Sequence, residues 1–151
     1  MPVLRLQTLI RAPPPDVFDA SLDVGLHQAS ARGTGERVIA GRREGRLELG
    51  ETVTWSARHF GLRWSMTVAI VEHERPHRFV DEMVSGPFAA MRHEHRFAPR
   101  HGGAATAMED VFSFRAPLGP LGRIAERLAL TRHMRRFLAG RNEHLKRALE
   151  G

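Results

Sequence analysis

The sequence predicts an α+β domain in which a curved antiparallel sheet of about seven strands wraps around a long C-terminal helix, with two short helices after the first strand. Two observations carry this prediction. Between residues 51 and 115, apolar and polar side chains alternate over strand-length segments that are separated by turn residues. Between residues 120 and 149, the apolar residues recur instead with the spacing of a helix. Successive strands followed by one long helix are typical of a sheet that is covered on one face.

The N-terminal part of the chain predicts one strand and two short helices. Residues 3–10 alternate like a strand, and the run of prolines after Ala12 ends it, because proline donates no hydrogen bond to a sheet ladder. A short helix is expected over about residues 16–22. Asp23 is a candidate N-cap for a second short helix that runs to about Ala31, and residues 36–40 predict a second strand.

Five further strands are expected in the middle of the chain. They cover about residues 51–60, 62–74, 78–84, 88–97 and 105–115, and they are separated by turn residues such as Gly61 and Ser85-Gly86-Pro87. Because alternate residues of a strand share a face, Trp55 and His59 lie on one side of the first of these strands. Met108, Asp110 and Phe112 share one side of the last strand in the same way.

The C-terminal segment predicts one helix of about 30 residues, which would be roughly 45 Å long. Pro120 stands at its start, where a missing backbone N–H is tolerated. The expected apolar stripe consists of Leu121, Ile124, Ala125, Leu128, Thr131, Met134, Leu138, Leu145 and Leu149. A helix of this length is able to cover one face of a whole sheet.

Length and composition favour one folded domain over residues 1–151. A chain of 151 residues that is 42% hydrophobic is large and apolar enough to bury a core. The absence of cysteine excludes disulfides, thiolate metal sites and cysteine nucleophiles. No apolar run reaches the roughly 20 residues of a membrane span, and the N-terminus does not resemble a signal peptide. We therefore expect a cytoplasmic protein.

The formal net charge of +6 comes mainly from arginine and raises the question of an anionic partner. Arginines cluster within residues 42–46 and again along residues 123–147. These clusters lack the interleaved stacking aromatic residues of single-strand nucleic-acid binders. A solvated face is the better interpretation, and we expect no nucleic-acid partner. A homodimer, formed through a strand edge or through the basic helix, stays open.

Four short stretches, in this order and followed by a long helix, carry a resemblance to a known superfamily. They are Ala-Pro-Pro-Pro-Asp-Val-Phe at residues 12–18, Gly-Glu-Thr-Val-Thr-Trp at 50–55, Arg-Pro-His-Arg-Phe at 75–79, and residues 86–97 with Gly-Pro-Phe and His-Glu-His-Arg-Phe. Over nearly its whole length the chain resembles the START and birch-pollen-allergen-like superfamily, also called SRPBCC, whose bacterial members are often labelled polyketide cyclase or dehydrase-like. The resemblance implies a helix-grip fold with a deep cavity for a lipid, a polyketide or another apolar molecule.

Polar residues on otherwise apolar strand faces are the candidates for orienting a ligand in such a cavity. His59, His93, His95 and Asp110 are candidate catalytic residues, because a His-Asp pair is able to act as general acid and base on an enolisable or hydroxylated substrate. The expected ligand contacts are Trp55, His59, Trp64, Met66, Met83, His93, His95, Met108, Asp110, Phe112 and Leu128. The alternative is structural, with histidines bonded to the backbone or to each other and an aspartate paired with an arginine.

The same four candidate catalytic residues also suggest a zinc or iron site, since His93 and His95 project to one side of a strand. Such a spacing arises easily by chance in a chain with 9 histidines, and no second metal motif supports it. We expect neither a metal nor another cofactor.

Three classes of function stay open, in this order of preference. A ligand carrier predicts an apolar cavity with few polar groups. A cyclase or dehydratase predicts histidine and aspartate side chains that converge inside that cavity. An interaction module predicts a filled core and a functional basic surface. The sequence identifies neither the ligand nor a reaction.

Overall fold

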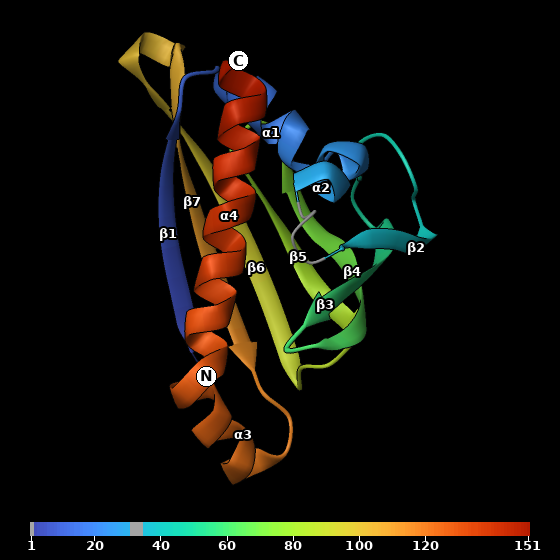
Figure 1. Cartoon of the computed structure of the whole chain (residues 1–151). Coiled ribbons are helices and arrows are strands. Elements are labelled where there is room, and N and C mark those ends of the chain that lie inside the picture. The colour runs from blue at the N-terminus through green and yellow to red at the C-terminus, as the bar shows by residue number, and fades with distance from the viewer. Residues whose placement is uncertain (1, 31–34) are drawn as a thin grey trace.

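The computed structural model describes residues 2–30 and 35–151, apart from the side chains of residues 30, 127 and 128. The elements follow one another in the predicted order (Figure 1). They are β1 (Val3–Ile10), α1 (Pro14–Ser21), α2 (Val24–Ser30), β2 (Arg37–Gly41), β3 (Thr52–His59), β4 (Leu62–Glu74), β5 (Arg78–Ser85), β6 (Ala90–Arg100), a 3₁₀ turn (His101–Gly103), β7 (Ala105–Arg115), α3 (Gly119–Ala125), a π-helical turn (Glu126–Leu130) and α4 (Thr131–Glu150).

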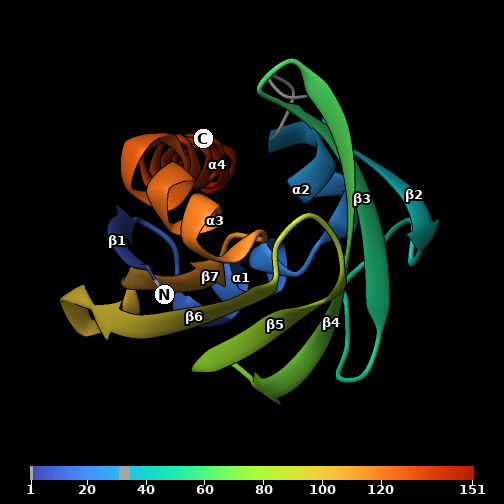
Figure 2. The same ribbon diagram turned by 90° about the horizontal axis from the view of Figure 1, so that it is seen from below.

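The strands form one 7-stranded antiparallel sheet in the order β1-β7-β6-β5-β4-β3-β2. Strands β2 to β7 each lie beside their neighbour in sequence, and β1 joins the sheet by pairing with β7. The sheet curls, so that α4 lies over β1, β7 and β6 while β3 and α2 stand on the opposite side of the concave face (Figures 1 and 2). The predicted α+β helix-grip architecture is confirmed.

A two-residue turn fixes the register of β3 against β4. His59 pairs with Leu62, and Phe60 and Gly61 between them have φ angles of 54° and 75°. Two successive positive φ values are typical of a type I′ turn, whose twist matches the twist of the strands that it joins. In this register every second residue of both strands faces the concave side of the sheet.

Asp23 caps α2 as the sequence predicts. Its Oδ1 accepts a hydrogen bond of 2.9 Å from the backbone N–H of Leu26, which satisfies one of the free donors at the start of the helix. The helix is described from Val24 to Ser30, so the predicted end at Ala31 lies outside the described residues. Because α2 contacts α4 and β2, it closes one side of the space between helix and sheet.

The long C-terminal helix is confirmed, but it contains a π-helical turn that the periodicity does not predict. The π-helical turn separates α3 from α4, and two hydrogen bonds hold it. The hydroxyl of Thr131 donates to the backbone oxygen of Glu126 at 2.8 Å. The backbone N–H of Ala116 donates to Oε1 of the same buried glutamate at 2.9 Å. Glu126 therefore ties the helix to the chain that leaves β7.

The π-helical turn divides the predicted apolar stripe. Leu121 and Ile124 in α3 are 70% and 55% exposed, whereas Met134 and Leu138 in α4 are buried. The buried face of α4 also includes a polar residue, Asn142. None of the described helices is both long and apolar enough to cross a membrane.

Strand β6 starts and ends later than predicted. It begins at Ala90 instead of Phe88, since Pro87 donates no hydrogen bond and the backbone N–H of Ala89 makes the first contact with Arg115, at 2.8 Å. It continues to Arg100, because Pro99 keeps its place opposite Thr106 on β7. The strand therefore carries both His93 and His95 in its middle.

Candidate functional site

A cavity of about 350 Å³ lies between the concave face of the sheet and α4. Aromatic and aliphatic side chains form most of its wall, among them Trp55 and Ala57 of β3, Met66 and Val68 of β4, Phe112 of β7, and Phe137 and Leu138 of α4. A volume of this order and a mostly apolar wall are typical of sites for small molecules.

The mouth of the cavity lies at the end of the molecule that carries α3 and the β3–β4 turn. Four large apolar residues line the cavity and are also exposed: Phe60, Trp64, Leu118 and Leu121. Side chains that belong both to a cavity wall and to the molecular surface mark the place where the cavity opens to solvent.

The structure brings most of the predicted ligand contacts to this cavity. Seven of them line it, namely Trp55, His59, Trp64, Met66, His93, His95 and Phe112. Met108 and Asp110 line a smaller neighbouring cavity of about 30 Å³, which shares His93 and His95 with the first. Met83 lines neither cavity but packs against the core, and the Leu128 side chain lies outside the described residues. The part of all these residues in ligand binding stays a prediction.

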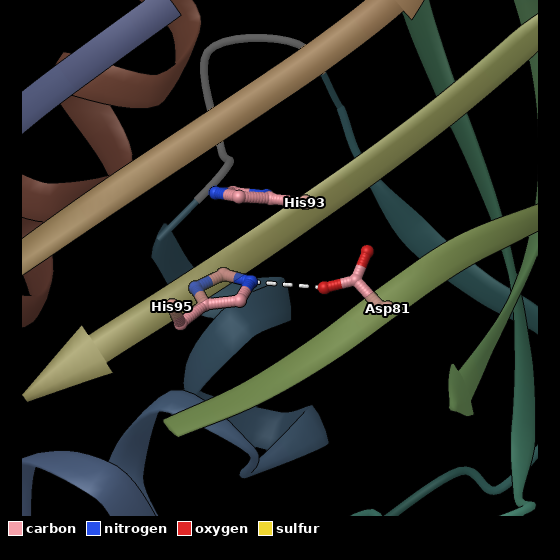
Figure 3. A group of neighbouring side chains, drawn as sticks. All are labelled: Asp81, His93 and His95. Atoms are coloured by element: carbon pink, nitrogen blue, oxygen red, sulfur yellow. Dashed lines mark hydrogen bonds and ion pairs between the residues drawn. The ribbon is translucent and has the colours of Figure 1, made fainter. Parts of the chain in front are cut away.

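A network of buried histidines and aspartates forms the floor of the cavity. His93 and His95 of β6 stack with ring centroids 3.8 Å apart, because alternate residues of a strand project to the same side. Oδ1 of Asp110 lies 2.8 Å from Nε2 of His93 and 3.3 Å from Nδ1 of His95. Nε2 of His95 lies 2.9 Å from Oδ2 of Asp81 on β5, as Figure 3 shows.

The network contains a charged histidine beside a neutral one. Burial on its own would lower the pKa of His95, but hydrogen bonds to Asp110 and Asp81 outweigh it and raise the pKa to about 9. Burial and the charge of His95 lower the pKa of His93. Burial would raise the pKa of Asp110, yet hydrogen bonds from both histidines hold it far below its usual range. At neutral pH an imidazolium thus lies between two carboxylates.

Two members of this network are not among the site residues predicted from the sequence, and the partners of Asp110 are not the arginine of the structural alternative. Asp81 follows Phe79 by two residues on β5, and both side chains line the cavity, so strand alternation is the signal that identifies it. Asn142 donates from Nδ2 to Oδ2 of Asp110 at 2.6 Å. It follows Leu138 by four residues, so the helical period is the signal for it.

The metal site considered from the sequence does not form as a set. Asp81, His93 and His95 offer ligand atoms within 4.8 Å of one another, but His59 is not part of this group. Both ring nitrogens of His95 point at carboxylates, Nε2 at Asp81 and Nδ1 at Asp110. The donor chemistry fits a hydrogen-bonded network better than a metal centre.

His59 belongs to a second histidine pair near the cavity mouth. Its Nδ1 lies 2.7 Å from Nε2 of His133 on α4, and the Phe137 ring lies edge-on to it at 5.1 Å. Burial and the neighbouring His133 lower the pKa of His59 to about 4. Burial, followed by the charge of Arg136, also lowers the pKa of His133. One hydrogen bond between two neutral imidazole rings therefore joins the C-terminal end of β3 to α4.

The fold is similar to that of several solved structures. A protein from Thermus thermophilus superposes with a TM-score of 0.75 and 18% identity, over 97% of this chain and 99% of that chain. A major latex-like protein from Panax ginseng has a TM-score of 0.68 and 15% identity, over 98% and 97%. A START superfamily protein from Mycobacterium smegmatis has a TM-score of 0.68 and 16% identity, over 95% and 98%. Identities this low show a shared fold.

Family membership rests on the sequence as a whole. No curated protein matches the chain in sequence. The family model described as "Polyketide cyclase / dehydrase and lipid transport" matches residues 1–150. The chain therefore belongs to the polyketide cyclase / dehydrase and lipid transport family.

Proposed function

We propose that the protein binds one small, largely apolar molecule in the cavity between the sheet and α4. The observation that carries this proposal is the volume of about 350 Å³ enclosed by mainly apolar side chains. Moving apolar ligand surface out of water contributes roughly 25 cal/mol per Å², so such a wall favours lipid-like, polyketide or aromatic molecules. The family description, which includes lipid transport, supports the same class of ligand.

An interaction module is the weaker alternative. That function needs a filled core, whereas this core contains a cavity with an exposed apolar mouth. The cytoplasmic location and the absence of a nucleic-acid partner stay predictions from the sequence, and a homodimer stays open.

Titration with the neutral fluorescent probe N-phenyl-1-naphthylamine tests ligand binding. Ala57 is buried and lines the cavity, so Ala57→Trp fills it, while Ala139→Trp adds the same indole to the exposed side of α4. We expect one probe per chain with the wild type and with Ala139→Trp, and binding at least about tenfold weaker with Ala57→Trp. Thermal unfolding checks that both variants fold. A wild type that ignores this probe and a panel of lipids and aromatic compounds contradicts the proposal.

Acid–base catalysis in the same cavity is a second candidate function, favoured by the contact between His93 and Asp110. Because Asp110 is ionised, Nε2 of His93 carries the ring proton and donates a hydrogen bond to the carboxylate. The lone pair of this neutral ring is then on Nδ1, which has no hydrogen-bond partner among the residues that the structure describes. Such a ring is suited to take a proton from a bound molecule.

Deuterium exchange into 2-tetralone, a neutral enolisable ketone, tests this candidate. The carbon next to the carbonyl would give its proton to Nδ1 of His93, and the enolate would take back a deuteron from D₂O. We expect exchange faster than in a histidine buffer of equal concentration, and loss of this excess in His93→Ala while probe binding and folding are kept. An unfolded His93→Ala variant, or exchange no faster than in buffer, favours a purely structural role for the ring.

A further inference from the structure

Arg141 of α4 is a cation in the wall of the apolar cavity. The other described arginines of this helix, at positions 132, 135, 136 and 147, are exposed, whereas Arg141 is half-buried and lines both cavities. Its guanidinium carbon lies 5.2 Å from the centre of the Phe137 ring. Within the described part of the chain, it makes no ion pair and no hydrogen bond. All of its N–H donors are therefore available.

The charge of Arg141 contributes to the lowered pKa of two histidines that line the cavity. Burial lowers the pKa of His27 most, and the charge of Arg141 is the second cause. The same charge contributes to the lowered pKa of His59, after burial and His133. The half-buried guanidinium therefore acts on half-buried histidines of α2 and β3.

Glu36, just before β2, is a second unpartnered polar group in the cavity wall. It is only 9% exposed, and its Oε1 is buried without a hydrogen-bond partner among the described residues. Burial raises the pKa of Glu36, which favours the neutral carboxyl form, while the charge of Arg141 opposes this shift. Glu36 and Arg141 thus lie within electrostatic reach of each other. Neither forms an ion pair with any residue that the structure describes.

A buried polar atom without a partner, such as Oε1 of Glu36, costs about 1–3 kcal/mol. Together with the unpaired guanidinium of Arg141 on the same cavity wall, it indicates that a bound molecule satisfies both groups. We propose that the ligand carries a carboxylate, which accepts hydrogen bonds from the guanidinium of Arg141 and from the carboxyl O–H of Glu36. The inference rests on the proposed ligand-binding function and deepens it by naming the headgroup. The planar guanidinium matches a carboxylate with two parallel hydrogen bonds.

Charge disfavours cationic and neutral headgroups. An ammonium group would be repelled by Arg141, and a neutral amide or ester oxygen would leave the guanidinium charge unbalanced. The remaining wall is apolar, so the body of the ligand is aliphatic or aromatic and lies against side chains such as Trp55 and Phe112. The ligand class is therefore a monocarboxylic acid with an apolar body that fits about 350 Å³.

Calorimetric titration with two isosteric pairs tests the headgroup. The pairs are decanoate with decanamide, and 2-naphthoate with 2-naphthamide. In each pair the apolar body is the same and only the charge of the headgroup differs. We expect the wild type to bind each carboxylate at least about tenfold more tightly than its amide.

Variants then assign the preference to the two side chains. Arg141→Met should bind both members of each pair equally. Arg141→Lys should keep a reduced preference for the carboxylate, because lysine retains the charge but not the planar guanidinium that makes two parallel hydrogen bonds. Glu36→Gln keeps a neutral donor and should keep the preference. Arg132→Met, which removes the same charge from the exposed face of α4, is the matched control and should behave as the wild type.

Two results overturn this inference in distinguishable ways. Equal affinity of the wild type for acid and amide, or an unchanged preference in Arg141→Met, contradicts the carboxylate headgroup while leaving ligand binding intact. Failure of all four compounds and of the neutral probe to bind contradicts the proposed function itself, and the headgroup with it.

Discussion

Asn142 of α4 donates a hydrogen bond of 2.6 Å to Oδ2 of Asp110 in β7. Oδ1 of the same carboxylate holds two histidines of β6, so Asp110 connects the helix with the charged network of the sheet. Apolar packing does not fix the rotation of a helix on a sheet as narrowly as a buried hydrogen bond does. The contact therefore orients the face of α4 that carries Phe137, Leu138 and Arg141.

Removal of this donor should destabilise the protein. In Asn142→Leu, Oδ2 of a buried carboxylate loses its partner, and we expect the free energy of unfolding to fall by about 1–3 kcal/mol. Glu143→Leu changes the exposed side of the same helical turn and should alter the free energy of unfolding by less than about 1 kcal/mol. Urea denaturation followed by circular dichroism measures both. Equal stability of Asn142→Leu and the wild type would show that the contact contributes nothing.

Stability should decrease on the alkaline side because of His95. Its pKa in the folded protein, about 9, lies above the ordinary value of 6.5, so the folded state holds this proton more tightly than the unfolded state. The resulting stabilisation is complete below pH 6.5 and is lost as the pH rises through about 9. The full shift corresponds to a contribution on the order of 3 kcal/mol.

The amino-acid composition allows the contribution of His95 to the pH dependence of stability to be measured with little interference. The chain has 0 cysteines and 0 tyrosines, so few other side chains titrate between pH 7 and 9.5. Denaturation midpoints at pH 7 and 9.5 should differ in the wild type and in the exposed-site control His101→Gln, but not in His95→Gln. A wild type whose stability is flat over this range argues against a buried imidazolium.

The pair of His59 and His133 should respond to acid instead. Because the pKa of His59 in the folded protein is lowered to about 4, the unfolded state takes up its proton first, and stability falls as the pH decreases from 6.5 towards 4. Proton NMR of the ring Cε1–H should show a His59 midpoint near 4.

In His133→Phe the ring contact with Phe60 is kept, but the second titrating ring is lost. The midpoint of His59 should then rise part of the way towards its ordinary value, since burial still lowers the pKa. The control His101→Phe should leave it unchanged. A His59 midpoint of about 6.5 in the wild type would mean that the two rings do not form this pair.

The sequence predicts the sheet well because each strand carries its own alternation and each turn its own signal. Gly61 and Asp23 identify a hairpin turn and a helix cap from local rules, and both predictions are confirmed. The π-helical turn inside the long C-terminal helix was not predicted, for a non-local reason. Glu126 bonds to Ala116 and the helix widens into a π turn there, a contact that helical periodicity does not contain.

The site was only partly predictable for a similar reason. Alternation placed His93, His95 and Asp110 on inward faces, but their partners come from other elements, Asp81 from β5 and Asn142 from α4. Arg141 was assigned to a solvated face together with its neighbours, because helical spacing alone does not show which arginine lies against the cavity. Tertiary packing makes that distinction.

Native mass spectrometry of the protein purified from its own host, compared with the same sample after denaturation, tests ligand binding most directly. We expect one small apolar molecule per chain, released on denaturation, ionising as a carboxylic acid, and absent from Ala57→Trp. A chain that is empty as purified, and that binds neither the neutral probe nor the carboxylates, would contradict a ligand-binding function for this cavity.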